Sequence, residues 1–108
     1  WKAGVKFSYQ TDPSRFGTSY MWYQAATAVK YGLPRDVALK AGTLYPAQIL
    51  GLDDRFGSIE KGKAADLVIL TGDPLETMTW VDSVLVGGQI VYQRSKDEKL
   101  KRVLDLIK

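Results

Sequence analysis

Hydrophobic and polar residues alternate over residues 4–10, and this period of two predicts a short strand. One side of the strand is polar and consists of Lys6, Ser8 and Gln10. If the period continues, Asp12 leaves the end of the strand on that polar side. The following TDPS sequence, residues 11–14, is typical of a turn.

Three short segments with apolar residues at helical spacing come next. The first, over about residues 19–31, repeats its apolar residues at i, i+3, i+4 and i+7, and Gly32 is expected to end it. Pro34 suits the first turn of a second helix. Pro46 does the same for a third helix, which Gly51 ends. The joints between the three helices are short, which favours tight packing.

The pattern changes to strands after about residue 53. Residues 67–70, LVIL, form a continuous apolar run that is typical of a strand covered on both faces. The segments WVDSVLV and QIVYQ flank Gly87 and Gly88, and a Gly-Gly pair supplies the positive φ angles of a two-residue hairpin loop. We therefore expect a small β unit that contains a hairpin.

A last helix is expected over about residues 96–107. Ser95 and Glu98 have the spacing of a capping box at its start. Its apolar positions form one stripe, which suggests a helix that docks on another part of the protein; a membrane-surface helix and self-association are the alternatives. The stripe consists of Leu100, Val103, Leu104 and Ile107.

Composition restricts the chemistry of this chain more than its fold. The 108 residues are 45% hydrophobic and 25% charged, which is ordinary for a folded domain but far short of the roughly 250 residues of a complete (β/α)₈ barrel. The sequence contains no His and no Cys, which excludes disulfides, a thiolate nucleophile, a Ser-His couple and a Cys- or His-based zinc site. Composition alone argues against a self-contained enzyme.

The net charge of +3 is confined to the end of the chain. Residues 94–108 carry six basic and three acidic side chains, and the rest of the chain carries nine of each sign. A nucleic-acid-binding protein would instead have a basic stripe with interleaved aromatic residues, so we expect no nucleic-acid partner.

The sequence also lacks the features of a membrane or exported protein. It has no apolar run near the roughly 20 residues of a membrane span, and the start WKAGVKFSYQ has no apolar stretch of a signal peptide. It does not begin with Met, so we expect it to be a piece of a longer chain. The absence of cysteines fits a cytoplasmic location.

Three features occur together in the order found in one family. A strand ending in Thr-Asp is followed by ALKAGTLYPAQILGL, and then by GSIEKGKAADLVIL leading to VLVGGQIV. Over about residues 3–93 this sequence resembles the carboxy-terminal portion of the amidohydrolase superfamily, in particular imidazolonepropionase-like and related metal-dependent hydrolases.

The resemblance implies an α/β fragment: the last β/α unit of a TIM-like barrel and the carboxy-terminal strands of a small composite β-sandwich. Residues 1–52 would be the end of the barrel domain, with its eighth strand and the helices after it. Residues 53–93 would be sandwich strands, and residues 94–108 a terminal helix.

The resemblance also assigns a role to Asp12. In the family, the aspartate at the end of the eighth strand binds a catalytic divalent metal ion and accepts a proton from the attacking water. A carboxylate at the carboxyl end of a barrel strand faces the active site, which suits both roles. On its residues alone, Asp12 would instead be a turn or capping residue.

Other polar and aromatic residues have structural interpretations. Asp66 is expected to accept hydrogen bonds from nearby backbone N–H groups in the loop from Gly62. Residues 61–63, KGK, lack the spacing of a phosphate loop and indicate a solvated turn. The aromatic residues of the first helix region are expected to pack rather than line a pocket. They are Tyr20, Trp22, Tyr23 and Tyr31.

Two functions fit these observations. The first is the carboxy-terminal part of a metal-dependent amidohydrolase, with zinc as the expected metal, which hydrolyses a C–N bond of a small amide or cyclic amide. Its partner would be the remainder of the same enzyme chain, and the isolated chain would bind no metal and be inactive. The second is a non-catalytic assembly or binding module that reuses the sandwich strands. In either case, unpaired strand edges predict homo-oligomers.

Overall fold

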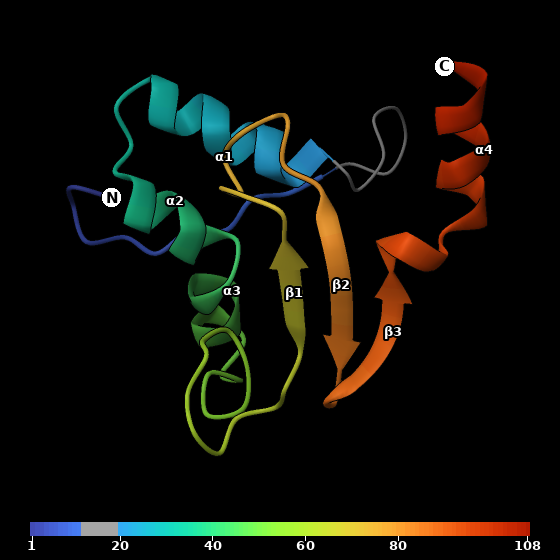
Figure 1. Cartoon of the computed structure of the whole chain (residues 1–108). Coiled ribbons are helices and arrows are strands. Elements are labelled where there is room, and N and C mark those ends of the chain that lie inside the picture. The colour runs from blue at the N-terminus through green and yellow to red at the C-terminus, as the bar shows by residue number, and fades with distance from the viewer. Residues whose placement is uncertain (12–19) are drawn as a thin grey trace. The chain divides into compact units, whose positions relative to one another are not determined.

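The computed structural model describes residues 1–11 and 20–108, which form two compact units (Figure 1). Residues 1–63 and 74–77 make up the first unit, and residues 64–73 and 78–108 the second. The predicted division into 1–52, 53–93 and 94–108 refers to parts of a longer enzyme and stays a prediction. No helix in the described part of the chain is long and apolar enough to cross a membrane.

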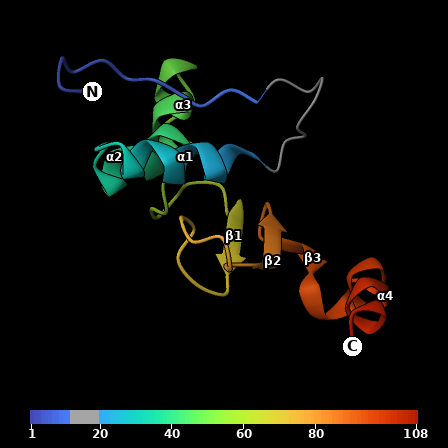
Figure 2. The same cartoon turned by 90° about the horizontal axis from the view of Figure 1, so that it is seen from above.

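The described part of the first unit contains three α-helices, and the sequence predicted all three. They are α1 (Met21–Lys30), α2 (Arg35–Ala41) and α3 (Leu44–Ile49). Within this unit, α3 runs across the direction of α1 (Figure 2). The residue after α1, Tyr31, is followed by Gly32 at φ 102°, and Gly51 after α3 has φ 68°. Both glycines adopt the left-handed conformation that ends a helix, as predicted.

Small residues form the centre of this unit. Ala25 of α1 and Ala38 of α2 are fully buried and pack with Leu75. A side chain on Gly42, the residue after α2, would come within 3.2 Å of the Trp22 ring. The helices therefore approach closely because their facing positions are small, and Trp22 covers the contact.

The loop after α3 packs against that helix through Gly57. A Cβ atom at this position would lie 2.8 Å from the Cβ of Ala47 and 2.9 Å from the Cα of Leu44, and the φ angle is +90°. Only glycine fits both the backbone conformation and the space. This close approach holds the loop after α3 against that helix.

The strand predicted over residues 4–10 is not present, although the alternation is. Residues 5–11 have no strand pairing, while Phe7, Tyr9 and Thr11 are half-buried and the residues between them are exposed. A strand is defined by backbone hydrogen bonds to a neighbour, and no described segment pairs with this one. The period of two correctly predicts which side of residues 5–11 is half-buried, but it does not show whether a neighbouring strand is present to pair with them.

The second unit is built on a three-stranded antiparallel sheet in the order β1-β2-β3. Its strands are β1 (Leu67–Leu70), β2 (Val81–Val86) and β3 (Gln89–Gln93). Gly87 and Gly88 form the predicted two-residue turn with φ angles of 56° and 80°. The hairpin that the sequence predicted is therefore confirmed.

Strand β1 is more exposed than its apolar sequence predicted. Val68 and Ile69 are 57% and 48% exposed, whereas a strand covered on both faces would be buried. The sheet has three strands, and β1 is at one edge of it. An apolar run of this kind indicates that both faces of the strand are covered by other residues in the folded protein. The described residues do not cover both faces of β1.

The last helix, α4 (Glu98–Leu106), begins later than the capping box predicted. Ser95 lies inside a 3₁₀ turn over Arg94–Lys96, so it cannot serve as the cap. Asp97 does so instead: its backbone is extended, and its Oδ1 accepts the N–H of Leu100 at 3.0 Å. The other carboxylate oxygen of Asp97 accepts the hydroxyl of Tyr92 at 3.0 Å, which ties the start of α4 to the end of β3.

Candidate functional site

Asp12, the residue predicted to act as metal ligand and base, lies outside the described residues. The structure does describe residues 1–11, which lead to it, and the helices of the first unit. Residues 1–11, the approach segment, directly precede Asp12 in the sequence.

Tyr9 fixes one face of the approach segment against the helices. Its side chain packs on the cluster formed by Ala25, Ala38 and Leu75, and the Phe7 ring meets it edge-on at 6.1 Å between centroids. The Tyr9 hydroxyl is buried and has no hydrogen-bond partner among the described residues. Burial raises the pKa of this phenol, so Tyr9 stays neutral and is a packing residue rather than an acid or base.

The backbone of Gln10 is held to α1. The Nε2 atom of Gln24 donates a hydrogen bond to the Gln10 carbonyl oxygen at 3.1 Å. Together with Tyr9, this bond orients the end of the approach segment relative to the helix. Lys6, Ser8 and Gln10 are exposed on the face opposite to the helix contacts. In a (β/α)₈ barrel, the strand face that does not meet the helices lines the barrel interior.

The described residues do not assemble a metal site. They contain no group of three or more His, Cys, Asp or Glu side chains in suitable positions. The whole sequence has no His and no Cys, so carboxylates are the side chains of this kind that remain. A catalytic zinc site uses about three protein ligands, and Asp12 is a single one. Within the described part of the chain, therefore, no set of side chains fits a catalytic divalent metal ion.

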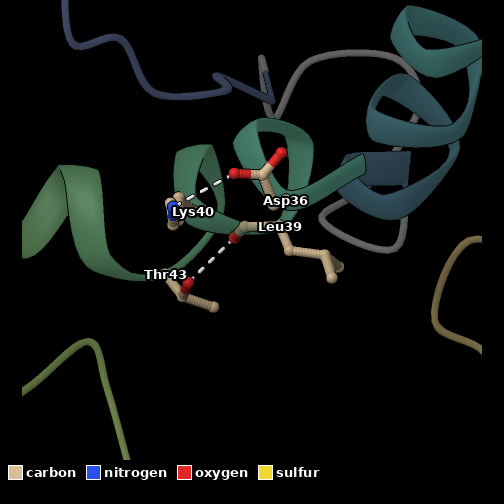
Figure 3. Close-up of polar contacts among 4 residues, drawn as sticks. All are labelled: Asp36, Leu39, Lys40 and Thr43. Atoms are coloured by element: carbon tan, nitrogen blue, oxygen red, sulfur yellow. Dashed lines mark hydrogen bonds and ion pairs between the residues drawn. The ribbon is translucent and has the colours of Figure 1, made fainter. Parts of the chain in front are cut away.

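Helix α2 carries a polar pair whose role is structural (Figure 3). The Nζ atom of Lys40 lies 3.1 Å from Oδ2 of Asp36, one turn away, and the hydroxyl of Thr43 donates to the Leu39 carbonyl at 2.8 Å. The hydrogen bond from Lys40 lowers the pKa of the Asp36 carboxyl group. Both partners of the ion pair are exposed, so its contribution to stability is small.

Residues 58–63 form a second polar cluster, and here one prediction is corrected. Lys63 was expected to lie in a solvated turn, but its side chain is 12% exposed and its Nζ donates to the Ser58 hydroxyl at 2.6 Å. The same ammonium group is 3.3 Å from Oε1 of Glu60, and Ser58 also donates to that carboxylate. These contacts lower the pKa of Glu60, with the Ser58 hydrogen bond as the largest cause. The turn is closed by its own side chains, which a search for a phosphate loop does not detect.

Asp66 has the structural role that was predicted, but with a different partner. Its Oδ1 atom accepts the N–H of Gly87 at 2.7 Å, and the adjacent Gly88 N–H donates to the Ala65 carbonyl at 3.0 Å. The residues before β1 therefore hold the turn between β2 and β3, rather than the loop at Gly62. The sequence separation of 21 residues explains why local reasoning did not find this bond.

The aromatic residues around α1 divide into two groups. Trp22 packs against the helix core, as predicted. Tyr20, Tyr23 and Tyr31 are exposed, and the first two rings contact each other with centroids 5.0 Å apart. The expectation that these residues pack therefore holds for Trp22 in the helix core and for Tyr20 and Tyr23 on each other at the surface, whereas Tyr31 is 82% exposed.

Comparison with known proteins covers most of the chain. Residues 1–91 match the amidohydrolase family. Imidazolonepropionase from Thermoplasma volcanium is 36% identical over 80 residues, which is 68% of this chain and 20% of that protein. N-acetylglucosamine-6-phosphate deacetylase from Haemophilus influenzae is 49% identical over 45 residues, or 41% of this chain and 12% of that protein.

A solved structure gives the same result. An amidohydrolase from Thermotoga maritima MSB8 is 42% identical, with a TM-score of 0.82, over 86% of this chain and 24% of the solved chain. The chain thus spans about a quarter or less of the length of these relatives. The order of helices and strands seen here is similar to a segment of a larger amidohydrolase. On the match over residues 1–91 and this likeness, the chain belongs to the amidohydrolase family.

Proposed function

We propose that this chain is the carboxy-terminal part of a metal-dependent amidohydrolase that hydrolyses a C–N bond of a small amide or cyclic amide. The observation that carries the proposal is the match of residues 1–91 to the amidohydrolase family. The names of the relatives support the reaction class, because they include a deacetylase of N-acetylglucosamine-6-phosphate and an imidazolonepropionase. The remaining residues of the active site belong to the rest of the longer protein.

Within that enzyme, Asp12 is the residue of this chain that acts in the reaction. Its carboxylate accepts a proton from the attacking water and is one of the ligands of the divalent metal, for which zinc is our proposal. The packing of Tyr9 on the helices supports this role, because it leaves the alternate face of residues 4–10 free to line the barrel interior. Continuing the period of two assigns Asp12 to that free face.

The remainder of the first unit positions this residue. The bond from Gln24 to the Gln10 carbonyl and the burial of Tyr9 hold the approach segment on α1. A carboxylate is an effective base only when it is within hydrogen-bond reach of the proton that it removes. We therefore assign residues 1–52 to the positioning of Asp12, and the sheet of the second unit to the small sandwich domain.

The test is Asp12→Asn in the full-length enzyme that carries this sequence. An amide is nearly isosteric with the carboxylate but accepts no proton at working pH, so kcat should fall by about 10²–10⁴ through lost base catalysis. The measurement is kcat at saturating metal with N-acyl and cyclic amide substrates, together with the thermal unfolding midpoint.

The matched control is Asp54→Asn, which makes the same chemical change at an exposed aspartate in the loop after α3. It should keep both kcat and the unfolding midpoint of the unmodified enzyme. If Asp12→Asn retains activity within about threefold, Asp12 is not the base, since base catalysis contributes far more. If Asp12→Asn instead lowers the unfolding midpoint sharply, Asp12 is a turn or capping residue.

A further inference from the structure

The connection between β1 and β2, residues 71–80, contributes to both units. Residues 71–73 and 78–80 belong to the second unit with the strands, whereas residues 74–77 belong to the first unit with the helices. The chain therefore leaves the second unit after β1, contributes residues 74–77 to the first unit, and returns to form β2. The first unit is complete only when this segment, distant in sequence from its helices, is in place.

Leu75 is the residue of this loop that enters the helix core. It is 8% exposed and packs with Ala25 of α1 and Ala38 of α2, which are fully buried. In the described part of the chain, the buried apolar residues are Leu75 and four alanines. Partly buried residues that include Tyr9 and Trp22 pack against the same cluster. Leu75 therefore supplies the largest buried side chain of the helix core, although it does not belong to a helix.

The base of the loop is closed by residues of the second unit. The Thr71 N–H donates to the Trp80 carbonyl at 2.9 Å, and the Trp80 N–H donates to Oγ1 of Thr71 at 2.9 Å. A Cβ atom on Gly72 would come within 3.1 Å of Oγ1 of Thr79, so the two sides of the loop lie close together. The guanidinium group of Arg94, the residue after β3, lies 4.7 Å from the centre of the Trp80 ring. These contacts hold the two ends of the loop together.

A closed base makes the helix core depend on the sheet. When β1 and β2 are paired, residues 74–77 are confined to a short loop, and Leu75 is available to the helix core at a high effective concentration. When the strands separate, the same leucine is on a free chain, and placing it in the core costs the entropy of ordering that chain. The dependence is mutual by linkage, because a buried Leu75 also favours the closed loop and the pairing of β1 with β2.

We propose that residues 71–80 couple the folding of the two units: Leu75 completes the helix core while the sheet holds the base of the loop closed, so the two units unfold together. The burial of Leu75 is produced by residues of this chain itself, so it does not depend on which surfaces the remainder of a longer enzyme covers. This coupling is independent of the reaction proposed for Asp12.

Hydrogen exchange of the 108-residue chain, followed by mass spectrometry of its peptides, tests the coupling because it measures the stability of each unit separately. Leu75→Ala removes the leucine from the helix core, so the slowest amides of α1 and α2 should exchange at least about 30-fold faster. The slowest amides of β1 and β2 should also exchange faster, by at least about fivefold, because the sheet loses its share of the coupling. Met78→Ala, at an 81% exposed residue of the same loop, is the matched control and should change neither unit.

A second variant tests the coupling from the side of the sheet. Thr71→Val keeps the shape of the side chain and removes the oxygen atom that accepts the Trp80 N–H, so the base of the loop should open more readily. The slowest amides of α1 and α2 should then exchange about 2- to 10-fold faster, although Thr71 belongs to the second unit. In the double variant with Leu75→Ala, Thr71→Val should have no further effect on α1 and α2, because no leucine is left for the loop to hold in the core.

Three results would overturn the coupling. The first is faster exchange in α1 and α2 of Leu75→Ala with a change of less than about fivefold in β1 and β2, because the units would then unfold independently. The second is a change of less than about twofold in α1 and α2 of Thr71→Val. The third is an effect of Thr71→Val on these helices that persists in the double variant. If Leu75→Ala unfolds the whole chain, Leu75→Val removes less of the side chain, and exchange that is faster in only one unit of that variant would equally overturn the coupling.

Discussion

Replacing Gly57 by alanine tests the closest packing in the first unit. The new methyl group would lie 2.8 Å from the Cβ of Ala47, 2.9 Å from the Cα of Leu44 and 3.0 Å from the Thr43 carbonyl oxygen. Two of these neighbours are backbone atoms in or next to α3, so the steric clash can be removed only if the loop or the helix moves. Gly57→Ala should therefore separate the loop from α3.

Gly62→Ala is a control that isolates this contact. Gly62 has φ +92°, almost the same as the +90° of Gly57, but a Cβ atom there meets nothing within 4 Å. Both alanines suffer the left-handed backbone, at about 1–2 kcal/mol. Only Gly57→Ala adds overpacking, which costs about 1–3 kcal/mol. The expected losses are thus about 1–2 kcal/mol for Gly62→Ala and about 2–5 kcal/mol for Gly57→Ala.

The measurement is urea unfolding of the 108-residue chain, followed by tryptophan fluorescence, with Trp22 reporting on the helix core. A chain of this length has a total stability of roughly 5–15 kcal/mol, so the loss at Gly57 should be plain from the midpoint. Equal losses in the two variants, within about 0.5 kcal/mol, would show that the loop yields freely. The close approach of Gly57 to α3 would then have no energetic consequence.

Two further predictions concern pH and metal. Hydrogen bonds from the N–H of Leu100 and the Tyr92 hydroxyl lower the pKa of Asp97, so the stability of α4 should fall as the pH drops from about 5 to below 4. Asp97 in turn raises the pKa of Tyr92, so the stability of α4 should fall again as the pH rises above about 10. Helicity measured by circular dichroism should follow this window and lose its upper limit in Tyr92→Phe, and a flat profile would contradict the assignment. The 108-residue chain should bind no stoichiometric zinc, because Asp12 is a single ligand, and micromolar zinc affinity in equilibrium dialysis would refute this.

The sequence predicted elements whose cause is local. The helix-ending role of Gly32 and Gly51 and the hairpin turn at Gly87 and Gly88 follow from backbone preferences of single residues, and the structure has all of them. Each of these choices is decided within a few residues along the chain. They would be the same in a fragment and in a complete protein.

The features that failed depend on partners distant in sequence or on competition between neighbours. Residues 4–10 alternate as a barrel strand would, but pairing needs a second strand that no described segment supplies. Ser95 and Asp97 compete to cap α4, and the 3₁₀ turn after β3 decides in favour of Asp97. The spacing of apolar and polar residues does not decide whether residues 4–10 find a pairing strand or which of Ser95 and Asp97 caps α4.

The sequence proposes one residue of the candidate site, Asp12, which lies outside the described residues and stays a prediction. Spacing assigns Asp12 to the polar side of the approach segment, and its chemical role comes from the resemblance to a family. A turn aspartate would look the same in the sequence, since both uses require a short acidic side chain at the end of a strand.

The bond between Asp66 and Gly87 has a consequence for the order of folding. The β2–β3 hairpin needs a loop of two residues and forms in about 1–10 μs, whereas β1 joins it only after the longer connection over residues 71–80 has closed. We therefore expect Asp66 to make its 2.7 Å contact with the hairpin turn late, after the entropy of that loop has been lost. Because a late contact slows unfolding and leaves the folding rate nearly unchanged, we expect Asp66→Ala to shorten the lifetime of the folded sheet with little change in its folding rate.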